Sequence, residues 1–433
     1  MKGFDEERGK KMKRIAAWIA LICLWIGCAE SAFAKPILPS QQDDMQDDAQ
    51  QEPKTVRIPD TAAEIFYEYV GERSVSAFEV SPDHPTLTSV DGVLFSKDGT
   101  RLLLFPAGRT GELYSVPEGT KVIGKRAFER CSMDAVELPA SVEELGYDTF
   151  ELCEAEIRVS PDNPFFAVED GALLDWSQKL LVHYDFSGLF WKDEALMSMG
   201  MEDGAKPELE EKTCRVPDGI EVIGNSAFSL NYLLTEVRLP ESLERIGESA
   251  FAYCLGLRKV DIPDNVKIIG RRAFQGSGLS EIHFGKGVER IEDWAFAECM
   301  LSEIEIPDSA AEVSCLAFES NELERFIVSP DHPTLSEQDG VLFSKDGTEL
   351  ISYPRNRGGM QDGEVYHIPD GTKRIAESAF YHCRWELTVV VPDSVEEIHP
   401  LAFWGGDVTL RVGEGSYAQR FAEEENYDYV IGE

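Results

Sequence analysis

The chain has 433 residues, of which 43% are hydrophobic and 10% aromatic, so it can bury a sizeable core and is not a disordered acidic chain. Its formal net charge is −39 at pH 7. A surface this acidic repels nucleic acid and anionic lipid, which excludes both as partners, and it suits solubility and basic partners.

The first 34 residues have the pattern of a secretory signal peptide. A basic region around Lys13 precedes an apolar stretch, residues 15–27, that is too short to span a bilayer comfortably. Ala32-Phe33-Ala34 fits the cleavage pattern of such peptides. In an alternative interpretation, Cys28 becomes a lipidated N-terminus. No second apolar segment follows, so we expect no transmembrane segment in the mature chain.

Residues 35–54 are rich in Gln and Asp and almost free of apolar side chains. Burial cannot offset the entropy of ordering such a segment. We therefore predict a flexible acidic linker between the signal peptide and the folded part of the chain.

An internal repeat occupies most of residues 55–430. An Ala-Phe dipeptide recurs, and within runs the Phe residues are 22 or 23 positions apart, which is the signature of a repeat architecture. The recurring positions are Phe128, Phe228, Phe251, Phe274, Phe296, Phe318, Phe380 and Phe403, with Phe150 after a Thr as a ninth.

Each repeat predicts a short strand followed by a convex turn or 3-10 segment. Val260 and Ile262 alternate with the polar Lys259 and Asp261, which is strand periodicity, and Pro263 ends the strand. One unit is too small to bury its apolar face, but stacked units about 4.8 Å apart share a continuous core. The repeat thus predicts a β-rich solenoid of roughly ten coils.

The repeat resembles that of the BspA-like leucine-rich-repeat family of bacterial surface proteins. The resemblance rests on recurring Ile-Pro-Asp, Val-x-x-Ile-Gly and Ala-Phe blocks, as in Ile262-Pro263-Asp264 and Ala273-Phe274, and covers roughly residues 56–430. It implies a leucine-rich-repeat solenoid, exposed or secreted, that binds proteins or host surfaces. It also implies a short closing helix near 416–425. The cell-wall sorting motif that would explain attachment is absent from the sequence.

Three segments interrupt the repeat and predict β-hairpin insertions, near 80–115, 159–214 and 328–366. In the first, residues 93–95 form one arm, Asp98-Gly99 the turn and residues 102–104 the return arm. Residues 56–106 align without gaps on 304–354, with 27 of 51 positions identical, so the outer part of the array is duplicated.

The second hairpin has an extended tail, residues 185–214, which we interpret as a candidate binding loop carrying Phe186, Phe190 and Trp191. The alternative is a tolerated surface insertion without function, because loops accept insertions at little thermodynamic cost.

The cysteines and histidines favour structural roles. Cys131 and Cys254 are among five cysteines placed three residues after a repeat Phe, which predicts buried thiols, although secretion also permits disulfides between coils. His84 and His332 occupy the same duplicated Asp-His-Pro corner, which predicts a turn role over metal ligation. Ser-Lys-Asp-Gly-Thr at 96–100 predicts a hairpin turn over a calcium loop. We expect no metal or cofactor site.

The solvent-facing strand positions form the candidate binding surface, since solenoids bind ligands along stacked columns of side chains. The alternative is an ordinary solvated face. One predicted column contains Arg238, Asp261, His283 and Glu305, and the column beside it contains Lys259, Glu281, Glu303 and Arg325.

These patterns predict a non-enzymatic, secreted or cell-surface module that binds a protein or glycan ligand outside the cell, with a role as an adhesin. The alternative is a non-catalytic scaffold or accessory module of an extracellular, polysaccharide-processing system. The sequence contains no phosphate-binding loop, nucleophile elbow or zinc-protease motif, so we expect no enzymatic activity.

Overall fold

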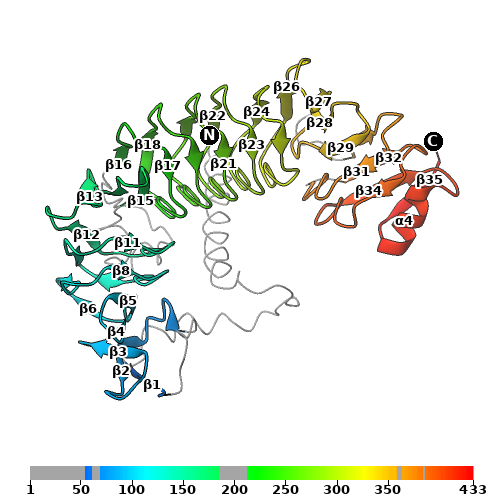
Figure 1. Cartoon of the computed structure of the whole chain (residues 1–433). Helices are drawn as coiled ribbons and strands as arrows, with labels where there is room; N and C mark the ends of the chain where they lie inside the picture. The colour runs from blue at the N-terminus through cyan, green and yellow to red at the C-terminus, as the bar shows by residue number, and fades with distance from the viewer. Residues whose placement is uncertain (1–53, 61–68, 185–211, 358–362, 384–385, 433) are drawn as a thin grey trace, which may run out of the picture. The chain divides into compact units, whose positions relative to one another are not determined.

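A computed structural model describes residues 54–60, 69–184, 212–357, 363–383 and 386–432. All of them belong to one compact unit, a solenoid of about 15 turns (Figure 1). The segments that we interpret as signal peptide and acidic linker lie outside the described residues, except for Lys54, which begins the first strand and is not the end of a linker. Phe186, Phe190 and Trp191 also lie outside the described residues.

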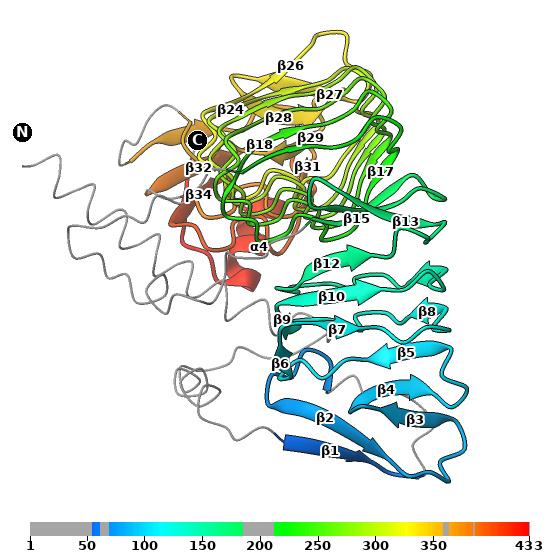
Figure 2. The ribbon, with the colours of Figure 1, turned by 90° about the vertical axis from the view of Figure 1, so that its left-hand side faces the viewer.

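Each regular coil contributes two strands, and not the single strand that the sequence predicted. The second strand is only two residues long, as in β21 (Ile268–Ile269), which is why its period-2 pattern is not visible in the sequence. The short strands of the central coils pair in one continuous parallel ladder, whereas the longer strands pair in parallel in separate sheets of two to four strands (Figure 2).

The longer strands lie on one side of the coils, here called the long-strand face, and are β1 (Lys54–Ile58), β2 (Val75–Val80), β7 (Tyr114–Ser115), β10 (Ala135–Leu138), β12 (Glu156–Val159), β16 (Lys212–Arg215), β18 (Leu234–Arg238), β20 (Lys259–Asp261), β22 (Glu281–His283), β24 (Glu303–Ile306), β26 (Arg325–Val328), β30 (Val365–His367), β32 (Leu387–Val391), β34 (Val408–Val412) and β35 (Tyr429–Ile431). The short-strand face consists of β8 (Val122–Ile123), β11 (Glu144–Leu145), β17 (Val222–Ile223), β19 (Arg245–Ile246), β21, β23 (Arg290–Ile291), β25 (Glu312–Val313), β31 (Arg374–Ile375) and β33 (Glu397–Ile398). A further parallel pair is β6 (Thr110–Gly111) with β9 (Ser132–Met133).

Antiparallel strands occur at each of the three positions where the repeat is interrupted. The first set is β3 (Leu87–Val90), β4 (Val93–Ser96) and β5 (Arg101–Leu104), the second is β13 (Phe166–Glu169), β14 (Ala172–Asp175) and β15 (Leu180–Tyr184), and the third is β27 (Leu335–Gln338), β28 (Val341–Ser344) and β29 (Glu349–Ser352). In each set the last strand also pairs in parallel with the short-strand face, as β5 does with β8. These segments therefore begin new sheets of the array.

A column of aromatic rings forms the centre of the core. The rings of Phe228, Phe251 and Phe274 stack with centroids 4.7 and 5.0 Å apart and interplanar angles of 13° and 5°. This spacing matches the distance between paired strands, so each ring rests on the ring of the next coil. All three residues are fully buried.

The antiparallel segments add rings to the column that the Ala-Phe search missed. Phe105 stacks on Phe128 at 5.1 Å, Tyr184 on Phe228 at 4.9 Å, and Tyr353 on Phe380 at 5.1 Å. Because these coils lack the Ala-Phe pair, the sequence predicted roughly ten coils where the structure has about 15.

The turns that carry the rings adopt unfavourable backbone angles. In the coil of Phe251, the residues two before and two after it, Ser249 and Tyr253, have φ angles of 54° and 58°. Non-glycine residues in this region cost roughly 1–2 kcal/mol each. The amide of Phe251 donates to the carbonyl of Ala273 at 2.6 Å and that of Tyr253 to Gln275 at 2.7 Å, so hydrogen bonds to the next coil hold the turn in this conformation.

The seven cysteines among the described residues have free thiols, and six of them are buried. The Sγ of Cys254 donates to the carbonyl of Phe228 at 3.1 Å, and Cys299 makes the equivalent bond to Phe274 at 3.2 Å. The packed-thiol interpretation is thus confirmed at these positions. The helix expected at the C-terminal end is present as α4 (Tyr417–Glu425), in which Ser416 caps the first turn and Phe421 closes the core.

Replacing a ring in the middle of the column should be costly. We expect Phe251→Ala to lower the free energy of unfolding by about 3–5 kcal/mol, because the cavity cannot collapse between two stacked neighbours. Urea denaturation followed by circular dichroism measures the loss. As a control, Lys267→Ala removes an exposed ion pair with Glu289 and should lower the free energy of unfolding by less than about 1 kcal/mol. An equal loss of stability in both variants would contradict the central role of the aromatic column.

His183 makes the stability of the fold depend on pH. Its ring packs 5.8 Å from that of Phe150, and complete burial lowers its pKa from 6.5 to about 4. Because the unfolded chain binds the proton more tightly, the stability contributed by neutral His183 is present above pH 6.5 and is lost as the pH falls to 4, by about 3 kcal/mol. Unfolding measured between pH 7 and 4 should show a shallower acid loss for His183→Gln than for the parent chain. Burial also raises the pKa of Glu151 to about 7, but Glu151 is present in both proteins, so its contribution to the pH dependence is the same in each. Parallel stability profiles for the two proteins would contradict the role assigned to His183.

Candidate binding surface

The eight residues predicted to form the binding surface lie together on five strands of the long-strand face, β18, β20, β22, β24 and β26, and all are exposed. They alternate with buried side chains such as Val260 and Ile304, which fixes their outward direction. Lys259 lies opposite Glu281, and Asp261 lies opposite His283 in the paired strands. These pairings agree with the predicted columns within β20–β22, and Glu303 likewise lies opposite Arg325, whereas among the described strands β18 does not pair with β20, nor β22 with β24.

The polar side chains on this face are largely paired with one another. Lys259 Nζ lies 2.7 Å from Glu281 Oε1, and His283 Nδ1 lies 2.7 Å from Asp261 Oδ1. The hydrogen bond from Lys259 lowers the pKa of Glu281. Arg325 Nη2 lies 2.8 Å from Glu303 Oε1. Exposed pairs of this kind contribute little to stability because solvent screens them.

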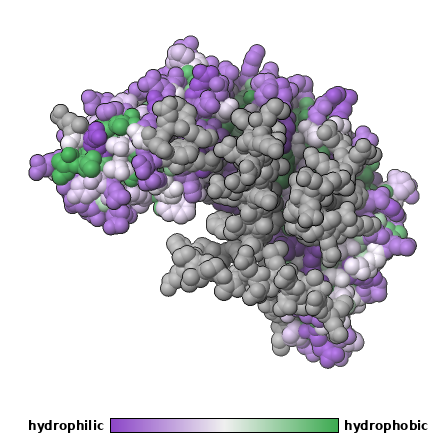
Figure 3. Space-filling view, turned by 180° about the vertical axis from the view of Figure 1, so that it is seen from behind, coloured by the Kyte–Doolittle hydropathy of each residue, from purple (hydrophilic) through white to green (hydrophobic). Residues whose placement is uncertain are grey.

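The short-strand face carries similar pairs. Lys267 Nζ lies 3.0 Å from Glu289 Oε1, and Lys121 Nζ lies 3.1 Å from Glu143 Oε1, each 22 residues apart. Charge pairing between coils therefore accompanies stacking on both faces and does not by itself mark a ligand site. The face seen in Figure 3 is predominantly hydrophilic where it is described, with small hydrophobic patches.

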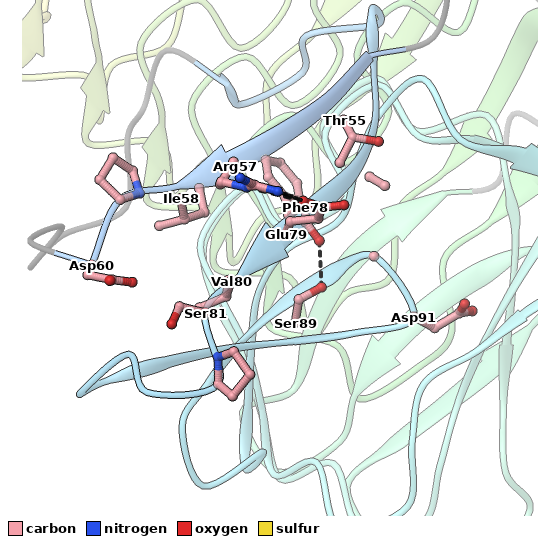
Figure 4. Close-up of a pocket in the computed structure, with 14 residues that line it drawn as sticks. Thr55, Arg57, Ile58, Asp60, Phe78, Glu79, Val80, Ser81, Ser89 and Asp91 are labelled. Atoms are coloured by element: carbon pink, nitrogen blue, oxygen red, sulfur yellow. Dashed lines mark hydrogen bonds and ion pairs between the residues drawn. The ribbon is translucent and has the colours of Figure 1, made fainter.

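The N-terminal end of the long-strand face has a groove of about 990 Å³ that sequence reasoning missed (Figure 4). Strands β1 and β2 contribute Arg57 and Glu79, which form an ion pair at 3.1 Å. The β3–β4 hairpin contributes Ser89 and Asp91. The duplication in the sequence could have indicated this groove, because Ala77, which lines it, corresponds to the much larger Arg325 in the second copy.

The duplicated hairpin corners have a structural role. His84 Nδ1 accepts a hydrogen bond from the Leu87 amide at 3.1 Å, and His332 accepts one from Leu335 at 3.0 Å. In the second hairpin, Asn163 Oδ1 accepts from the Phe166 amide at 2.9 Å. The turn role predicted for both histidines is confirmed, and an Asn carbonyl performs the same function.

The Ser-Lys-Asp-Gly-Thr segments are hairpin turns, as predicted. Asp98 accepts hydrogen bonds from the Ser96 hydroxyl at 2.6 Å and the Thr100 amide at 3.0 Å, which lower its pKa. Asp346 makes the equivalent bonds in the duplicate. Within the described ranges, no three His, Cys, Asp or Glu side chains converge as metal ligands would. Nor does any described helix have the length and apolar character needed to cross a membrane.

A family model described as BspA type leucine rich repeat region matches six copies, over residues 112–172, 208–329 and 363–409. A comparison with curated proteins found no match. Among solved structures, a leucine rich cell surface protein from Faecalibacterium prausnitzii is 21% identical, with 77% of each chain covered and a TM-score of 0.43. A leucine-rich repeat protein from Bacteroides ovatus is 15% identical, with 88% of this chain and 92% of that chain covered and a TM-score of 0.36. One from Eubacterium ventriosum is 14% identical, with coverage of 82% and 89% and a TM-score of 0.41.

The equivalence of His and Asn at the hairpin corner predicts which substitutions are tolerated. We expect His332→Asn to keep the free energy of unfolding within about 1 kcal/mol of the parent, and His332→Ala to lower it by about 1–3 kcal/mol, because a buried amide then loses its acceptor. Thermal and urea unfolding of both variants checks this. Equal losses would show that His332 acts through its volume and not through its acceptor.

Proposed function

Because the chain belongs to the BspA type leucine-rich-repeat family, we propose that it is a secreted or cell-surface adhesin that binds a protein ligand through the central long-strand face. Its role is binding and not catalysis. The signal-like pattern of residues 1–34 supports export, and the acidic segment 35–54 supports a linker that separates the solenoid from the site of attachment.

The observation that carries the proposal is the way the central strands present polar side chains. Five strands, β18 to β26, place exposed side chains in fixed columns over a core whose rings are stacked. A rigid, extended surface loses little conformational entropy when it binds another protein. The pattern of positive and negative side chains on this surface selects partners that carry the complementary pattern, since electrostatic complementarity provides specificity more than affinity.

The two faces offer a matched pair of substitutions that tests this proposal. Lys259 on the long-strand face and Lys267 on the short-strand face have similar exposed fractions, 47% and 51%, and each pairs with a Glu of the next coil. Lys259→Glu and Lys267→Glu therefore change net charge equally and cost similar stability.

The mature chain and both variants would be measured on an array of immobilised extracellular-matrix and cell-surface proteins. We expect at least tenfold weaker binding of Lys259→Glu to the proteins that the parent binds, and binding of Lys267→Glu within twofold of the parent. Equal effects of the two substitutions would remove the long-strand face from the proposal, and absence of any specific binding by the parent would remove the adhesin role.

A further inference from the structure

The groove at the N-terminal end is a second, separate feature of the long-strand face. Its floor is the outward surface of β1 and β2, and its wall is formed by the β3–β4 hairpin, which packs against Ala77 through Gly92 (Figure 4). A Cβ on Gly92 would lie 3.0 Å from that of Ala77, so the hairpin approaches the sheet as closely as the backbone permits. Its volume of about 990 Å³ is in the range of ligand-binding clefts.

The duplicated module provides an internal comparison for this groove. Nine lining residues recur unchanged in the second copy, 248 positions later: Ile58, Pro59, Asp60, Phe78, Val80, Ser81, Pro82, Asp91 and Gly92. The other five lining residues all differ, and four of them, Thr55, Arg57, Ala77 and Glu79, form the floor. The framework has thus been kept while the surface that a ligand would touch has changed.

Three of the five changes replace small side chains in the first copy by large ones in the second, while Arg57 and Glu79 are replaced by Glu and Ile. Arg325 stands in place of Ala77, and its guanidinium lies 2.8 Å from Glu303, which stands in place of Thr55. Glu337 stands in place of Ser89. The first copy is therefore open where the second carries an Arg–Glu pair across the same floor.

The lining of the open groove offers hydrogen-bond acceptors more than donors. Three carboxylates line it, those of Asp60, Glu79 and Asp91, against a single cationic residue, Arg57. The Arg57 guanidinium is already directed at Glu79, with which its Nε and Nη2 both form hydrogen bonds. Asp91 is 76% exposed although Arg109 contacts one of its oxygens. A ligand that supplies donors and positive charge complements this arrangement.

The remaining lining suits the stems of long basic side chains. Ala77 and the two prolines, Pro59 and Pro82, give apolar surface beside the carboxylates, and Lys and Arg lay their methylene chains on such surface while the charge reaches an acid. Among the described residues β1 pairs with β2 alone, so its other edge exposes backbone groups that an extended segment can bind.

We infer that this groove binds an extended, basic segment of a protein partner. The inference rests on the proposed binding function only in that the ligand is a polypeptide. The groove is distinct from the central strands that carry Lys259, so a failure of one site leaves the other unaffected.

The test transfers the residues of the second copy into the first. Ala77→Arg combined with Ser89→Glu leaves net charge unchanged and fills the groove, and the second copy shows that the framework accommodates both residues. The probe is a fluorescent ten-residue peptide of alternating Lys and Thr, titrated with the mature chain at two salt concentrations and followed by fluorescence anisotropy. We expect Kd to rise at least tenfold in the filled variant, with an unchanged melting temperature.

A charge-neutral double variant on the short-strand face, Lys267→Ala with Glu289→Ala, is the matched control, and it should bind the Lys-Thr peptide within twofold of the parent. The corresponding Glu-Thr peptide should not bind. Equal affinity of the parent and the filled variant would overturn the inference, because it would show that the peptide associates with the acidic surface at large. So would equal losses in the two double variants, or failure of the parent to bind the Lys-Thr peptide at low salt.

Discussion

The stacking of one aromatic ring per coil is the interaction on which the rest of the structure depends. Phe251 and its neighbours lie about 5 Å apart and nearly parallel, which is the spacing that parallel strands require. Each ring covers the next, so no coil has a core of its own. The strained turns beside Phe251 persist because hydrogen bonds to the next coil satisfy their amides. Stability is therefore a property of neighbouring coils together, as in other solenoids.

The antiparallel segments satisfy the same constraint in a different way. β5, β15 and β29 return from a hairpin and then pair in parallel with the short-strand face. Phe105, Tyr184 and Tyr353 each stack on the first Phe of the run of coils that follows, so the aromatic column begins again at each hairpin. The buried residues accordingly form separate hydrophobic clusters, and the boundaries between clusters fall at the hairpins. The hairpins consequently place a wall beside the long-strand face, and the groove beside β1 and β2 is a direct result.

Surface charge and core have separate roles in this chain. Pairs such as Lys259–Glu281 and Lys267–Glu289 repeat on both faces and contribute little to stability because solvent screens them. Since the core holds the coils together, the exposed positions are free to vary. The two copies of the duplicated module illustrate this freedom, with a shared framework and different floors. A solenoid can therefore carry more than one binding chemistry along one face.

The sequence by itself determined the coil, its period, the buried cysteines and the outward columns, because period-2 alternation and a recurring Phe are local patterns. It also predicted the turn roles of His84 and His332, which local hydrogen bonds confirm. Only the tertiary structure decided that two-residue strands such as β21 form a second ladder, since they gain their pairing from neighbouring coils. The groove likewise depends on how the β3–β4 hairpin packs on β2, because Ala77 and Ser89 are twelve positions apart and acquire their shared role only when folded.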